Sequence, residues 1–293
     1  MFFLSIHLIL SCIDHPIGRV NKDTLPHHTL MELLIQHIED KERFITHDAA
    51  GLVDWSGVEL NDHGDVKGFY STVKLSGTVD FQWLPETIEA VQITYTQLQG
   101  SVDFSSFPQP LTHLELNDGR FTGSGDMRTL PTELKRMNIS RNSFGGFLYL
   151  QCLPQGLRTF YASSNNFSGT VSFDSLPKSL EDINLSKNQL GGELSFDRLP
   201  RGMLRLSISR NGFSGLLQLV NLPEKLRIGI FCYNRFTGTP VIPKIPNDVQ
   251  SLKITHNPLS GTLLLASADY DRVDVQGTQV KKVRIDELLD ERL

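Results

Sequence analysis

Cysteine is scarce in this chain of 293 residues, which has only Cys12, Cys152 and Cys232. An odd and widely spaced set is not a disulfide framework, and its spacings match no zinc-binding motif. Cys152 and Cys232 also occupy different phases of the repeat that organises the chain, so we expect these two thiols to lie apart.

Strong net charge and long apolar runs are also absent. The formal net charge of −5 gives no global reason to expect a nucleic acid or a membrane as the partner. No stretch after residues 1–12 is long enough to span a bilayer, so no transmembrane segment is predicted. Residues 1–12, MFFLSIHLILSC, have the character of a signal-peptide core, but no Lys or Arg precedes them. We interpret residues 1–20 either as a signal segment or as a disordered N-terminus.

Catalytic and metal-binding motifs are lacking too. Residues 123–126, GSGD, fall at a glycine bend without a Lys or a following helix, which argues against a phosphate-binding loop. No nucleophile-elbow sequence is present. Seven of the nine histidines lie in residues 1–63, and their spacings favour a polar cap surface over a zinc site. The sequence therefore predicts a protein that is not an enzyme and has no metal and no cofactor.

What the sequence does have is a repeat. A Leu-Pro pair, or a close variant of it, recurs every 23 residues, beginning at residues 84, 107, 130, 153, 176, 199, 222 and 245. No single copy can bury its apolar side alone, whereas stacked copies share one continuous core. The register of eight copies therefore predicts a solenoid.

The copy at residues 176–198 shows what the phases of the repeat do. Ile183 and Leu185 are two residues apart, so both point to the same side of a short strand. Leu194 and Phe196 alternate in the same way, which predicts a second short strand before the next Pro.

Two other phases predict ladders from coil to coil. Asn188 follows the first strand, and an inward amide can bond backbone groups that a turn leaves unpaired. Leu190 is replaced by Phe in most copies, which predicts a spine of stacked rings. Gly192 is matched in every copy, as expected at a tight bend. The asparagine ladder comprises Asn142, Asn165, Asn188, Asn211, Asn234 and Asn257, and the spine comprises Phe121, Phe144, Phe167, Phe213 and Phe236.

The pattern LxxLxLxxNxFSGxL resembles the leucine-rich repeat, and the Gly after Phe-Ser is similar to the plant-type subclass. The resemblance implies a mainly β fold with minor α structure, a curved parallel-sheet horseshoe and a helical N-terminal cap. It divides the chain into a cap at 21–60, a solenoid at 61–267, and a short last coil with a C-terminal cap at 268–293. Within the solenoid, a degenerate coil at 61–83 precedes the eight repeats at 84–267.

The N-terminal flank resembles the cap of that family. Residues 29–35 suit an amphipathic helix, and residues 54–58, DWSGV, are similar to the family's tryptophan motif. The cysteines that bracket this tryptophan in plant-type caps are missing here. Their absence favours the cytoplasm, whereas the apolar start favours secretion, so the location stays open.

The resemblance also implies a binding surface, because residues beside the strand leucines form the concave face in this family. In copies three to eight these phases hold nine Lys and Arg residues against Glu181 and Asp182, a formal charge of about +7. Aromatic and aliphatic side chains interrupt the charges, as in interface hot spots. The predicted partner-binding residues are Lys135, Arg136, Arg141, Arg158, Tyr161, Arg205, Arg210, Arg227, Ile230, Tyr233 and Lys253.

We predict a protein-binding or scaffolding module that holds an acidic protein or peptide on this face, with an open oligomeric state. Salt-sensitive binding should be lost when Arg136, Arg158 and Arg205 are reversed to Glu. The alternative is a secreted or surface-anchored recognition protein that binds another cell's protein or glycan. Nucleic acid is disfavoured, because the aromatic residues do not interleave regularly with the basic ones.

Overall fold

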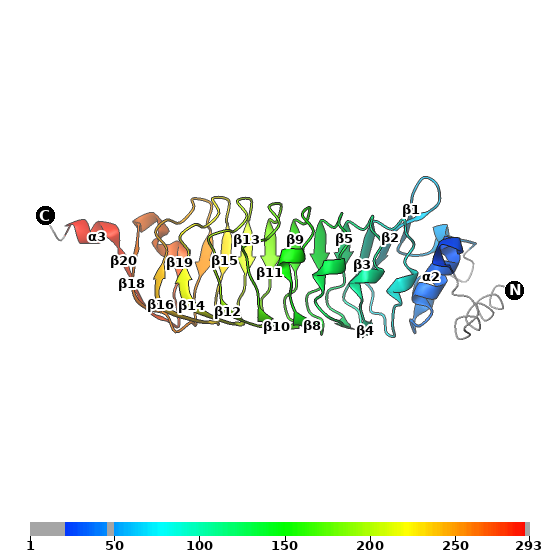
Figure 1. Ribbon diagram of the computed structural model, residues 1–293, viewed down its shortest axis with the longest axis horizontal. Helices are drawn as coiled ribbons and strands as arrows, with labels where there is room; N and C mark the ends of the chain where they lie inside the picture. The colour runs from blue at the N-terminus through cyan, green and yellow to red at the C-terminus, as the bar shows by residue number, and fades with distance from the viewer. Residues whose placement is uncertain (1–20, 46–49, 291–293) are drawn as a thin grey trace.

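The computed structural model describes residues 21–45 and 50–290, which form one elongated stack of coils (Figure 1). The apolar start at residues 1–12 lies outside the described residues. Each coil contributes a strand to one long sheet, then a segment on a second side, and then a short turn that leads to the next coil. The predicted fold class is confirmed as a mainly β, parallel solenoid with few helices.

The first side of the stack is an eleven-stranded sheet. Its first two strands form an antiparallel hairpin at the N-terminal end, and all the others are parallel. In chain order the strands are β1 (Val58–Leu60), β2 (Val66–Ser71), β3 (Ala90–Ile93), β5 (His113–Glu115), β7 (Arg136–Asn138), β9 (Thr159–Tyr161), β11 (Asp182–Asn184), β13 (Arg205–Ser207), β15 (Ile228–Ile230), β17 (Ser251–Lys253) and β19 (Val273–Asp274).

The second side carries parallel strands from the glycine-containing segment of each coil. They form a five-stranded sheet and two strand pairs. The strands are β4 (Gln99–Ser101), β6 (Arg120–Thr122), β8 (Gly145–Phe147), β10 (Asn166–Thr170), β12 (Gln189–Glu193), β14 (Gly212–Gln218), β16 (Arg235–Val241), β18 (Ser260–Leu265) and β20 (Gln279–Arg284).

The position of this second strand corrects one prediction. In the copy at 176–198 the strand ends at Glu193, before Leu194 and Phe196, although both side chains are buried as expected. After the strand, the Ser195 hydroxyl accepts the backbone N–H of Asp197, and the chain turns at residues 197–198. In the last three copies the strand extends further, to Gln218, Val241 and Leu265, and only the last of these includes both predicted positions.

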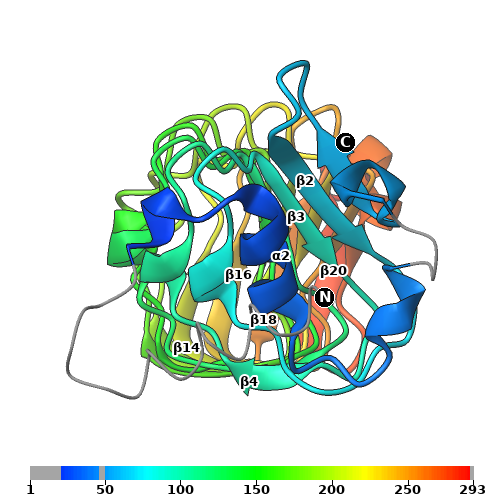
Figure 2. The same ribbon diagram turned by 90° about the vertical axis from the view of Figure 1, so that its right-hand side faces the viewer.

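The stack follows a nearly straight axis in Figure 1 rather than the arc of a horseshoe, and its coils largely superpose in the end-on view of Figure 2. Strands stack at about 4.8 Å, whereas a helix needs about 10 Å. Because both sides are built from strands, neither side spreads the coils apart, and the stack has little of the curvature that the resemblance implied.

Helices occupy the ends and turns of the stack. Helix α2 (His27–Ile35) lies across the N-terminal end (Figure 2), with Met31 and Leu34 fully buried. Helix α3 (Ile285–Asp290) follows β20 at the other end. No helix in 21–45 or 50–290 is long and apolar enough to cross a membrane. Short 3-10 turns lie at Lys22–Thr24, Lys41–Arg43, Leu52–Asp54, Phe81–Trp83, Phe104–Ser106, Met127–Thr129, Leu150–Cys152 and Ser267–Arg272.

The asparagine ladder is confirmed and ties each coil to its neighbours. Asn165 accepts the backbone N–H of Phe144 at 3.0 Å. Its amide nitrogen donates to the carbonyls of Ile139 at 2.9 Å and Ala162 at 3.2 Å. The same contacts recur at Asn188, Asn211, Asn234 and Asn257. Buried backbone groups that the turn leaves without strand partners are thereby satisfied.

The aromatic spine forms, but from two phases rather than one. Phe144 and Phe167 stack with ring centroids 6.5 Å apart and planes 6° apart. Leu190 interrupts this column, and rings of the later phase pack against its members, as Phe104 does against Phe144 at 5.9 Å and Phe196 against Phe236 at 6.4 Å. The core therefore depends on both phases. Cys152 and Cys232 are free thiols, as the repeat predicted for this pair.

Candidate binding face

The predicted binding residues lie on the outer surface of the eleven-stranded sheet or directly beside its strands, and we call this surface the sheet face. Residues 183 and 185 point inward in their coil and are buried, so residues 182 and 184 point outward. Strand pairing then places one outward residue beside the next. One row is Arg136, Thr159, Asp182, Arg205, Ile228 and Ser251, and the other is Asn138, Tyr161, Asn184, Ser207, Ile230 and Lys253.

Ion pairs between coils correct the predicted charge of this face. Arg136 Nε lies 2.6 Å from Glu115, and Arg141 pairs with Asp118. Both carboxylates belong to copy two, so they were outside the predicted charge of +7, which was counted over copies three to eight.

Two further cations are paired within the counted copies. Arg158 lies 3.3 Å from Glu181, and Arg205 Nε lies 3.7 Å from Asp182. Four of the predicted cations are thus partly neutralised, and the positive charge available to a partner is well below the formal count.

The other predicted cations have no ion pair on the described part of the chain. They are Lys135, Arg210, Arg227 and Lys253, and all four are exposed. Three of them lie in the last three repeats. The positive charge that a partner can use is therefore concentrated toward the C-terminal end of the sheet face.

The carboxylate of Asp182 lies in an environment that disfavours its charge. Burial raises the pKa of its carboxyl, against the lowering effect of Arg205. Its Oδ1 is buried and makes no hydrogen bond within the described residues, because Arg205 Nε is too distant. Burial also raises the pKa of the neighbouring Tyr161.

The aromatic and aliphatic side chains of the sheet face lie in two separate places. Ile228 and Ile230 lie on β15, between Arg205 and Ser207 on one side and Ser251 and Lys253 on the other. We call Leu204, Arg227, Ile228, Ile230, Tyr233 and Lys253 the C-terminal patch. Tyr161 lies three strands from Ile230, about 14 Å away, with Asn184 and Ser207 between them. It therefore stands apart from the patch.

One residue of each coil has a left-handed backbone just after the strand. We call these residues the αL row: Tyr95, Asp118, Arg141, Ser164, Lys187, Arg210, Tyr233 and His256, with φ between 51° and 60°. Three predicted site residues, Arg141, Arg210 and Tyr233, belong to it.

Three members of the αL row form a column. The guanidinium carbon of Arg210 lies 4.4 Å from the ring centroid of Tyr233. The rings of Tyr233 and His256 are 4.1 Å apart and nearly parallel, with 10° between their planes. His256 was not among the residues predicted from the sequence, although it has the same repeat phase as Tyr233 and could have been found from that phase.

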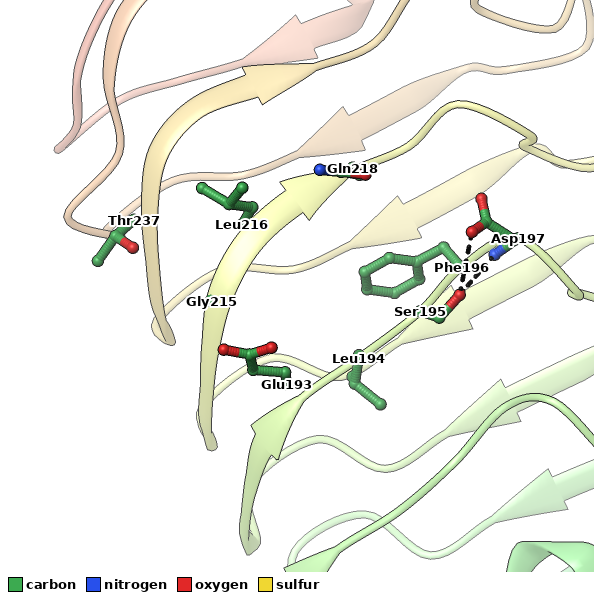
Figure 3. A pocket seen from close by; sticks show the side chains of 9 residues that line it. All are labelled: Glu193, Leu194, Ser195, Phe196, Asp197, Gly215, Leu216, Gln218 and Thr237. Carbon is green, nitrogen blue, oxygen red and sulfur yellow. Dashed lines mark hydrogen bonds between the residues drawn. The ribbon is translucent and has the colours of Figure 1, made fainter.

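The second side has a hollow of about 560 Å³ that no sequence pattern predicted (Figure 3). Glu193, Ser195, Asp197, Leu216 and Gln218 line it, and the Ser195 hydroxyl donates to the Asp197 carboxylate at 3.3 Å. Across residues 21–45 and 50–290, no three His, Cys, Asp or Glu side chains come together as metal ligands would.

Comparison with solved structures shows which known fold the chain shares. No family model matches the chain, and no curated protein matches it in sequence. Among solved structures, a plant ice-binding protein is 16% identical, with a TM-score of 0.65 over 90% of this chain and 96% of that one. The leucine-rich-repeat ectodomain of the receptor kinase GASSHO1/SCHENGEN3 from Arabidopsis thaliana, in complex with CASPARIAN STRIP INTEGRITY FACTOR 2, is 15% identical, with a TM-score of 0.61. This chain has the leucine-rich-repeat fold.

A second receptor supports the same assignment. The Arabidopsis receptor kinase HAESA, in complex with the peptide hormone IDA and the co-receptor SERK1, is 24% identical, with a TM-score of 0.54. This repeat protein covers 36% of the HAESA chain and 35% of the GASSHO1/SCHENGEN3 chain, while 70% and 86% of its own length is matched. It thus spans about a third of these receptor chains, and at such identities the likeness concerns the fold.

Proposed function

We propose that this leucine-rich-repeat protein is a non-enzymatic binding module whose C-terminal patch holds an acidic segment of another protein or a peptide. One observation carries the proposal. Ile228 and Ile230 remain partly exposed on β15, and the unpaired cations Arg227 and Lys253 lie beside them. Solubility needs no outward isoleucine, whereas an interface needs an apolar centre with a charged rim.

The solved neighbours lend support of a general kind. HAESA and GASSHO1/SCHENGEN3 are described in complexes with a peptide hormone and an integrity factor, on the same fold. The partner of this chain and the surface that holds it are our proposal. Arg and Tyr side chains dominate interface energies, and the patch provides both types.

An array of immobilised octapeptides that differ in their number of Asp and Glu residues tests the proposal. We expect the wild-type signal to rise with acid content and to fall strongly in an Arg227→Gln/Lys253→Gln variant. The matched control is Arg201→Gln/Lys225→Gln, which removes the same charge from exposed turns of the same stack. Equal loss in both variants would show that only net charge matters and would overturn the proposal.

A second candidate function, ice binding, follows from the second side. Hydroxyl side chains recur there on successive strands, with Thr237 and Thr239 exposed on β16 and Thr262 exposed on β18. Thr237 and Thr239 are about 6.6 Å apart along β16, and Thr262 lies on the next strand, about 4.8 Å to the side. Exposed hydroxyl groups at such spacings can order water. Supporting it, a plant ice-binding protein matches 90% of this chain over 96% of its own length.

Inhibition of ice recrystallisation tests this candidate. If the second side binds ice, a Thr237→Lys/Thr239→Lys variant should lose the activity, while Arg227→Gln/Lys253→Gln should keep it. No inhibition by the wild type would remove ice binding from consideration.

A further inference from the structure

The αL row carries side chains where the backbone disfavours them. Glycine adopts a positive φ easily, and Asn, Asp and His do so more readily than most residues, whereas side chains such as those of Lys187, Arg210 and Tyr233 are strained there by the contact of Cβ with the backbone. None of the eight residues in the row is Gly or Asn. Residues held in such conformations cluster at functional sites, so their side chains need an explanation.

The last coil provides an internal comparison. The N–H of His256 bonds the carbonyl of Gln276, just as the N–H of Tyr233 bonds that of Thr255. Gly277 therefore occupies the αL position of the last coil, with φ of 69°. The coil accepts glycine at this position, yet every preceding coil has a side chain there, and the four from Lys187 to His256 are all large.

The strained side chains also form an ordered, cationic surface at the C-terminal end. Lys187 and Arg210 are exposed on neighbouring coils, and the guanidinium of Arg210 is fixed over the ring of Tyr233. At the other end of the row, Asp118 already pairs with Arg141. A cation that is held in place before binding loses less entropy when it binds a carboxylate.

From this arrangement, and resting on the function proposed above, we infer that the αL row from Lys187 to His256 seats the carboxylates of an extended acidic segment that runs along the stack, across the strands. Neighbouring coils are about 4.8 Å apart and an extended chain advances about 3.3 Å per residue, so this stretch accommodates about four to five residues. Lys187 and Arg210 bind the acids, and the Tyr233–His256 stack provides a flat wall beside them.

Substitution by glycine separates this role from a structural one, because glycine relieves the strain while it removes the side chain. The probe is a fluorescein-labelled octapeptide of alternating Asp and Leu, with an Asn-and-Leu octapeptide as its control. We expect Lys187→Gly and Arg210→Gly to weaken binding of the acidic probe at least tenfold without lowering the Tm. Tyr95→Gly, in the same row but outside the segment, should leave binding unchanged. A lower Tm with unchanged binding would make the row structural and overturn the inference.

An Ile228→Ser/Ile230→Ser variant distinguishes this inference from the function on which it rests. Loss of binding in that variant, with full binding in the two glycine variants, would retain the C-terminal patch and reject the αL row. Failure of the folded wild type to bind the acidic probe better than its control would reject both.

Discussion

Arg210 and Tyr233 are 23 residues apart in the sequence, yet the guanidinium lies over the ring at 4.4 Å, and His256 covers the other face of that ring. One repeat length separates each member from the next. The repeat that builds the core therefore also builds a stacked column on the surface, where it can contact a partner.

Removal of the central ring should affect binding more than stability. Tyr233→Ala loses one cation–π contact and one ring stack at a 41% exposed site, so the free energy of unfolding should fall by about 1 kcal/mol. Binding of the acidic octapeptide should weaken at least tenfold, because Arg210 loses the ring that orients it. Urea unfolding and fluorescence anisotropy measure the two effects. Tyr233→Phe, which keeps the ring, should bind within about threefold of the wild type by the same argument, and a loss as large as that of Tyr233→Ala would contradict the stacking role.

The asparagine ladder should be essential for stability. Asn165→Ala leaves the N–H of Phe144 and the carbonyls of Ile139 and Ala162 without their amide partner. Each unsatisfied buried group costs about 1 to 3 kcal/mol, so a total loss of about 3 kcal/mol or more is expected by urea unfolding. The neighbouring Asn166 is exposed, and Asn166→Ala should change stability by no more than about 0.5 kcal/mol. Similar losses in both variants would contradict the ladder.

A side chain at position 169, in place of Gly169, should destabilise the folded protein. The φ of Gly169 is 81°, and an added Cβ would lie 2.5 Å from the ring of Phe147, which lies across it from the preceding coil. We expect Gly169→Ala to cost about 1 to 3 kcal/mol. In the control Gly156→Ala, the new methyl meets nothing within 4 Å, so stability should be unchanged or slightly higher.

A double variant separates the steric contact with Phe147 from the backbone strain at Gly169. Phe147 is 60% exposed, so Phe147→Ala alone should have little effect, and Phe147→Ala/Gly169→Ala should recover only the steric part of the loss. Full recovery would show that the positive φ contributes nothing.

Asp182 should make stability depend on pH in a defined direction. Because burial raises the pKa of its carboxyl in the folded protein, the folded state binds that proton more tightly than the unfolded state does. The stabilising effect of protonation is complete below the unfolded pKa, about 3.9, and is lost as pH rises through the folded pKa. Relative to Asp182→Asn, the wild type should therefore be more stable at pH 4 than at pH 7, measured by urea unfolding. A difference that does not change with pH, or that changes in the opposite sense, would contradict the unfavourable burial of Asp182.

The phases of the repeat predicted the solenoid, the asparagine ladder and the inward strand residues. Each of these features depends on a contact that repeats in successive coils. The ion pairs of Arg136 with Glu115 and of Arg158 with Glu181 could not be read from one copy, since each joins variable positions of adjacent coils. The left-handed backbone at Lys187 could not be predicted from the sequence, because neither Gly nor Asn occupies that phase in the eight repeats.

The ion pairs between coils also change the choice of residues for a test of binding. Reversal of Arg136, Arg158 and Arg205 would place new carboxylates beside Glu115, Glu181 and Asp182, so a loss of binding could follow from damage to the fold.

The most direct test of the central claim is the salt dependence of binding between the folded protein and the acidic octapeptide. If the C-terminal patch holds an acidic segment through Arg227 and Lys253, the wild-type Kd should rise steeply with NaCl concentration. Arg227→Gln/Lys253→Gln should bind weakly with little salt dependence, and Arg201→Gln/Lys225→Gln should behave as the wild type does. A Kd that does not change with salt, or a salt dependence equally reduced in both variants, would contradict the account.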